Sequence, residues 1–147
     1  MIRYALIAAA TLALAAPALA DGHRTASAEG AEVYFVGLED GATVQSPVTI
    51  VFGLRGMGVA PAGTEAENTG HHHLLINRPA FGEGEADEME FAILNDDNHR
   101  HFGGGQTEVA LDLPPGEHTL QLVLGDAGHV AHADPVMSER ITITVAE

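Results

Sequence analysis

Apolar and polar residues alternate along much of the chain, with a period of two rather than 3.6 residues. The clearest run contains Val48, Ile50, Phe52 and Leu54, and a similar alternation surrounds Leu122. Successive side chains of a strand point to opposite faces, so this period is typical of strands with one buried face. The pattern predicts seven strands, over residues 32–37, 48–54, 72–77, 89–94, 108–113, 120–124 and 141–145.

Turn-forming residues separate these strands. Asp40-Gly41, Ser46-Pro47 and Pro114-Pro115-Gly116 each mark a place where the chain changes direction. Short strands divided by such turns predict an all-β fold, an antiparallel immunoglobulin-like or fibronectin-like β-sandwich of about seven strands. No segment shows the periodicity of a helix of useful length.

The first twenty residues predict a secretory signal peptide. Arg3 precedes an apolar run, and Ala18-Leu19-Ala20 forms a small-x-small cleavage site. We therefore expect a signal peptide over residues 1–20, a flexible leader over 21–31 and one sandwich domain over 32–147. The mature protein is expected in the periplasm. No later segment reaches the roughly 18 apolar residues of a membrane span, so we expect no membrane insertion.

The composition narrows the range of partners. The chain has 21 acidic residues against six Arg and no Lys. Residues 1–20 hold one Arg and no acid, so five Arg face 21 acids in the mature protein, a formal net charge of −16. Such a surface repels nucleic acid and anionic membranes, so we expect neither as a partner. It attracts cations. The absence of Cys excludes disulfides and thiolate metal sites.

Three pairs of histidines predict a metal site. If every connection reverses the chain, the loops at 55–71, 95–106 and 125–138 share one end of the sandwich. Residues two apart in an extended strand point to the same side, so such a pair can meet one ion. Imidazoles in a chain without Cys favour copper or zinc. The predicted ligands, which lie in or beside these loops, are His71, His73, His99, His101, His129 and His132.

Four further residues are candidates for a role at this site. Met57 and Met137 lie in two of the loops, and their thioethers would favour copper if they were ligands. Asp97 can ligate directly, orient an imidazole or simply serve the turn that contains it. His72 points to the face opposite its two neighbours, and the strand pattern leaves open which face is turned inward. His118, which follows the Pro-Pro-Gly corner, is interpreted as structural.

Three segments carry a resemblance to a known family. They are NTGHHHLLI at residues 68–76, DDNHRHFGGGQTE at 96–108 and PVMSE at 135–139. With these motifs the chain resembles a family of small exported bacterial proteins, domain of unknown function 4399, over residues 33–146. The 78–90 stretch reads as an insertion relative to the family pattern. The resemblance implies an exported single domain and no established activity.

The leading hypothesis is a periplasmic sandwich that binds copper or zinc, for binding, buffering or delivery of the ion. Its partners would be the metal ion and another periplasmic protein. One alternative is a metalloenzyme with redox activity on the same histidines, as in superoxide dismutases of similar architecture. Another is a non-catalytic interaction domain whose histidine loops bind a peptide or another macromolecule. No nucleophile motif surrounds Ser27, Ser46 or Ser138, so a binding protein is favoured over an enzyme.

Overall fold

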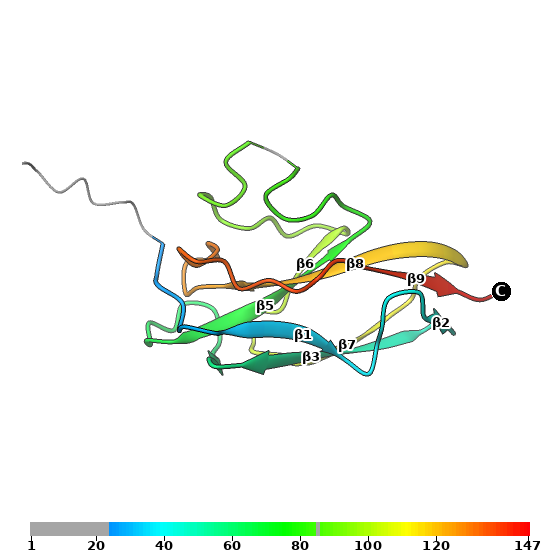
Figure 1. Ribbon diagram of the computed structural model, residues 1–147, viewed down its shortest axis with the longest axis horizontal. Helices are drawn as coiled ribbons and strands as arrows, with labels where there is room; N and C mark the ends of the chain where they lie inside the picture. Colours follow the sequence, from blue (N-terminus) through cyan, green and yellow to red (C-terminus); the bar gives the residue numbers. More distant parts are fainter. Residues whose placement is uncertain (1–23, 85) are drawn as a thin grey trace, which may run out of the picture.

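The computed structural model describes residues 24–84 and 86–147, which form two β-sheets packed face to face (Figure 1). The predicted signal peptide lies outside the described residues. The smaller sheet has the order β1-β3-β7 and is antiparallel, with β1 at Glu32–Val36, β3 at Val48–Arg55 and β7 at Glu108–Leu111. This arrangement confirms the predicted all-β, sandwich-like fold.

The larger sheet contains the other six strands. Its order is β2-β9-β8-β5-β4, and β6 also pairs with β5. The bounds are Thr43–Val44 for β2, Gly58–Val59 for β4, Thr69–Ile76 for β5, His99–His101 for β6, Gly116–Gly125 for β8 and Ile141–Val145 for β9. The pairs β2–β9 and β4–β5 are parallel and the remaining pairs are antiparallel, so this sheet is mixed.

The main core lies between the two sheets. Alternate residues of β3, β5, β8 and β9 point into it, as the period of two predicted for β3, β8 and β9. Leu120, Leu122 and Leu124 of β8 are fully buried there, and they face Ile50 and Phe52 in one cluster. This apolar burial is the dominant favourable contribution to folding.

The strand predicted at residues 89–94 does not form. That segment consists of turns and bends, with Phe91 66% exposed and Leu94 50% exposed, while Ile93 is buried. The apolar residues therefore do not share one face of a strand. The strand of this region is β6, which follows the Asp-Asn turn and pairs with β5 through His73–His101 and Leu75–His99.

Residues 77–84 and 86–98, which we call the covering loop, cross the outer face of the larger sheet, where Figure 1 shows them above β5 and β8. The described part of this loop contributes Phe81 and Ile93, which pack with Leu75, Val123 and Ala131 in a second apolar cluster. Both faces of β5 are consequently buried. This explains why Leu74, Leu75 and Ile76 follow one another in β5 without alternating with polar residues.

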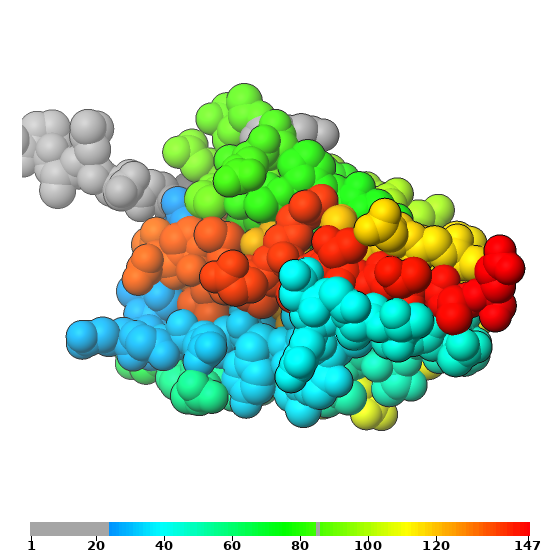
Figure 2. Space-filling model, turned by 45° about the vertical axis from the view of Figure 1, so that its right-hand side comes forward, coloured from blue at the N-terminus to red at the C-terminus, as the bar shows by residue number. Residues whose placement is uncertain are grey.

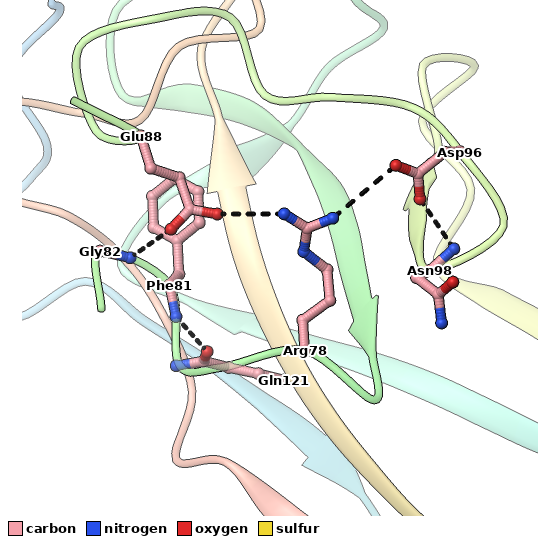
Figure 3. A network of polar contacts seen from close by, with 7 residues as sticks. All are labelled: Arg78, Phe81, Gly82, Glu88, Asp96, Asn98 and Gln121. Carbon is pink, nitrogen blue, oxygen red and sulfur yellow. Dashed lines mark hydrogen bonds and ion pairs between the residues drawn. The ribbon is translucent and has the colours of Figure 1, made fainter. Parts of the chain in front are cut away.

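Polar contacts fix the covering loop at its two ends (Figure 3). Arg78 lies 3.9 Å from a carboxylate oxygen of Glu88 and 3.7 Å from one of Asp96. The backbone N–H of Phe81 donates to Gln121 Oε1 of β8 at 2.8 Å. In Figure 2 the loop, in green, lies directly above the orange segment that follows β8, and Ile93 N–H donates to the carbonyl of His129 in that segment.

Three loops meet at one end of the sandwich, as the sequence analysis expected for its loops. Ala62 N–H donates to Gly103 O and Gly63 N–H donates to Ala127 O, each at 2.9 Å. These bonds join the segment before β5 to those after β6 and β8. Among the described residues, no helix is long and apolar enough to cross a membrane.

Candidate metal centre

Three histidines gather on the outer face of the larger sheet, and we call them the three-histidine cluster: His71, His73 and His101. His71 and His73 lie on the same face of β5 because they are two residues apart. His101 of β6 is directly opposite His73 in the antiparallel register. One nitrogen of each ring lies within 4.8 Å of the others, so the three can hold a metal ion.

The rings of the cluster are in direct contact. His71 Nε2 lies 3.0 Å from His73 Nε2. The ring centroid of His101 is 4.9 Å from that of His71 and 5.0 Å from that of His73. His101 Nε2 is buried and has no hydrogen-bond partner among the described residues. The donor set of the cluster is therefore entirely imidazole nitrogen.

Gly125 leaves space beside the two Nε2 atoms. It ends β8 opposite His71 in the register. A Cβ atom at this position would lie 2.8 Å from His73 Nε2 and 3.5 Å from His71 Nε2. Any side chain would therefore fill the space next to the paired nitrogens. Gly125 was not among the residues predicted for the site. The pattern that could have indicated it is a glycine at the end of an alternating strand.

Burial keeps the imidazoles of the cluster neutral. Burial, together with the neighbouring His101 and His129, lowers the pKa of His71 from 6.5 to about 4. Burial and the nearby histidines also lower the pKa of His73 to about 2, and burial lowers the pKa of His101. Because metal ligation requires a neutral imidazole, these rings are ready to bind an ion at neutral pH.

His129 approaches the cluster from the loop after β8. Its ring centroid is 4.7 Å from that of His101, 5.0 Å from that of His71 and 6.4 Å from that of His73. Its side chain is partly exposed, like that of His101. This is the side of the cluster that solvent can approach.

His99 is buried beside the cluster rather than within it. Its ring lies 6.0 Å from that of His73 and 6.3 Å from that of Phe81, centroid to centroid. Burial and the positive charge of Arg78 lower the pKa of His99 to about 4, and the carboxylate of Asp96 opposes both. At the other end, the carboxylate of Asp126 favours a positive charge at His71.

His72 and His132 lie away from the cluster. His72 points between the sheets, where its ring centroid is 5.2 Å from that of Phe52. His132 Nδ1 is 2.9 Å from the hydroxyl of Thr25, a residue in the stretch predicted as a flexible leader. Burial lowers the pKa of both histidines.

The remaining candidates take other positions. Met57 packs against the core between the sheets, and Met137 is 41% exposed and forms a β-bridge with Val123. Asp97 is exposed. His118, interpreted as structural, lies 3.0 Å from Asn77 Nδ2 through Nδ1 and 2.8 Å from the carbonyl of Pro114 through Nε2.

The sequence profile of the DUF4399 family, a domain of unknown function, matches residues 50–146. The chain belongs to this family. The match begins within β3 and includes the three-histidine cluster, Gly125 and the covering loop. Neither the curated proteins nor the solved structures contain a match to this DUF4399 chain.

Proposed function

We propose that this DUF4399 protein is an exported protein that binds Cu(II) or Zn(II) through His71, His73 and His101. The ion would be bound in the periplasm for buffering or for delivery to another protein. The observation that carries the proposal is the contact between His71 Nε2 and His73 Nε2, with His101 beside it and no side chain at Gly125.

The spacing of the two Nε2 atoms suits chelation. With metal–nitrogen bonds of about 2.0–2.1 Å, two ligands of one ion lie about 2.8–3.4 Å apart, depending on the angle between the bonds. The observed 3.0 Å falls in this interval. Without an ion, the same contact is a hydrogen bond in which one imidazole donates and the other accepts.

The chemistry of the donor set selects the class of metal. Three neutral imidazoles suit Zn(II) and Cu(II), whereas Mg(II), Ca(II) and Mn(II) prefer carboxylate, carbonyl or water oxygen. The group found within the described residues contains no carboxylate. A negatively charged surface would raise the local concentration of either cation.

A competitive titration tests the proposal. The untagged mature protein, stripped of metal, is titrated with Cu(II) and with Zn(II) in the presence of a chromogenic chelator of known affinity. We expect one tight site per chain, weakened more than roughly 100-fold by His101→Ala, which removes a ligand rather than a supporting contact. Equal affinities of the wild type and this variant would overturn the proposal.

Gly125→Ala provides a variant that keeps every histidine. Its methyl group would lie 2.8 Å from His73 Nε2 and occupy the space assigned to the ion. We expect it to prevent binding. Gly104→Ala is the matched control, because a Cβ there would meet only the flexible Gln106 amide at 3.1–3.3 Å. The control should bind like the wild type.

A further inference from the structure

His129 is held at the cluster by unusual backbone geometry. Its φ is +68°, in the left-handed region that residues other than Gly adopt uncommonly, although Asn, Asp and His are enriched there. Its N–H donates to the carbonyl of Asp126 at 3.0 Å. The Asp126 side chain accepts from the N–H groups of Gly128 and Val130, at 2.8 and 3.1 Å. One tight turn therefore sets the direction of the His129 ring.

The covering loop closes the other side of this turn. Ile93 N–H donates to the His129 carbonyl at 2.7 Å, and the Ile93 side chain is 7% exposed. Ile93 packs with Phe81, Val123 and Ala131 in the apolar cluster beneath the loop. The covering loop thus contacts the backbone of the residue whose ring lies 4.7 Å from His101 and 5.0 Å from His71.

We propose that His129 is a fourth ligand of the centre and that the covering loop slows the release of the ion by holding His129 in place. This inference rests on the proposed metal binding. His71 and His73 lie in a strand that is paired on both sides and are 1% and 0% exposed, so they form the fixed part of the site. His129 lies in a loop and is partly exposed, so it forms the part that can move when the ion enters or leaves.

The proposed ligands lie on two kinds of element, the rigid strand β5 and the more mobile turn that carries His129. A ligand on a paired strand contributes affinity because its position is preorganised. A ligand on a turn can leave first, and the rate at which it does so depends on the contacts that hold the turn. Ile93 is the described residue of the covering loop that makes the backbone contact to this turn. The loop would therefore regulate the lifetime of the complex more than its formation.

The test measures release of Zn(II) into excess chromogenic chelator by stopped flow. His129→Asn removes the imidazole but keeps a residue that tolerates the left-handed conformation. We expect more than roughly 100-fold faster release, because the variant removes a ligand rather than a supporting contact. Electron paramagnetic resonance of the Cu(II)-loaded protein should show the coupled nitrogens decrease from four to three.

The covering loop is tested by Ile93→Ala, with Phe91→Ala as the matched control. Phe91 belongs to the same loop but is 66% exposed, so its variant should release Zn(II) at the wild-type rate. Ile93→Ala should release the ion roughly tenfold faster, the lower range for loss of a supporting contact at a metal site, and therefore less fast than His129→Asn. If the loop acts through His129, the double variant should be no faster than His129→Asn alone.

The outcomes separate the two proposals. A wild-type protein that holds no ion would overturn both. A wild-type site that is lost in His101→Ala but unaffected by His129→Asn would overturn only the present inference. An acceleration by Ile93→Ala that persists in the His129→Asn background would show that the covering loop acts by another route, and would overturn the coupling. If Ile93→Ala fails to fold, Ile93→Val replaces it in the same measurements, because valine keeps most of the apolar contact.

Discussion

The two faces of β5 present the same residue type in opposite surroundings. His72 points between the sheets and contacts Phe52, and neither of its ring nitrogens has a hydrogen-bond partner among the described residues. Burial lowers the pKa of His72 to about 4, and the nearby backbone of Gln106 partly opposes this shift. His71 and His73, one residue to either side, point to the outer face, where they contact each other and His101.

This difference shows that burial alone does not identify a ligand. All three histidines of the triplet are at most 1% exposed, and burial lowers the pKa of each one. The outer face differs because its histidines have other imidazoles as neighbours and because Gly125 leaves space beside them. The inner face offers one histidine in an apolar layer, which is too few donors for an ion.

The same substitution on the two faces gives the largest expected contrast. His73→Leu should weaken Zn(II) and Cu(II) binding more than roughly 100-fold, because it removes a ligand. Loss of a residue that only supports a ligand typically weakens binding by less than this. His72→Leu should leave the affinity within about twofold of the wild type, since it changes no group that faces the ion. Competitive titration of both variants measures the contrast. Equal losses of affinity would mean that the faces are not functionally distinct.

Metal removal extends the comparison to stability. A ligand that binds only the folded state stabilises it by about 2.7 kcal/mol at 100 times its dissociation constant. We expect Zn(II) at that concentration to raise the melting temperature of the wild type and of His72→Leu, and a chelator to reverse the rise. His73→Leu should melt at the same temperature with and without Zn(II). Differential scanning calorimetry with matched chelator controls provides the measurement.

The metal-free protein should lose stability in mild acid through both faces. The folded-state pKa of His72 is about 4 and the ordinary value is 6.5, so the unfolded chain binds a proton that the folded chain does not. The contribution of His72 to the stability of the folded protein is therefore complete above pH 6.5 and is lost progressively as the pH falls to about 4. The slope is about 1.4 kcal/mol per pH unit for each such histidine, or about 2 kcal/mol at pH 5. His72→Leu should reduce the slope by one proton's contribution, as determined by urea denaturation at several pH values.

The fold was largely accessible from the sequence because its strands are amphipathic. The runs at Val48 and Leu122 alternate as half-buried strands do, and both form strands of the sandwich. The strand predicted over residues 89–94 was wrong because Phe91 and Ile93 have the spacing of a half-buried strand, whereas only Ile93 packs against an apolar surface. Which residue of a covering loop becomes buried depends on the sheet beneath it, and local sequence carries no such information.

The candidate site was accessible only in part for the same reason. The i, i+2 spacing placed His71 with His73, because it follows from strand geometry alone. The separation of His132 from the cluster depends on a contact with Thr25, 107 residues away in sequence. The role of Gly125 depends on the register between β5 and β8, which pairs it with His71. Long-range pairing of this kind cannot be read from spacing.

His72 itself provides the smallest and most discriminating prediction. An imidazole buried without hydrogen bonds costs free energy, and an apolar residue of similar volume removes that cost. Leucine also fits a layer already formed by Leu74, Leu122 and Leu124. We expect His72→Leu to raise the free energy of unfolding of the metal-free protein at pH 8 by about 1 kcal/mol, a typical net value for one polar group.

His118→Leu is the matched control for this measurement. His118 is also buried, at 6% exposed, but its nitrogens contact Asn77 and the carbonyl of Pro114. Its replacement should therefore lower the free energy of unfolding, by about 1–3 kcal/mol, because it leaves those partners unsatisfied. A loss of stability in His72→Leu as large as that in His118→Leu would contradict this prediction, because it would mean that the inner imidazole stabilises the folded protein. The inner face would then hold its histidine for structure, and the contrast between the faces would rest on metal binding alone.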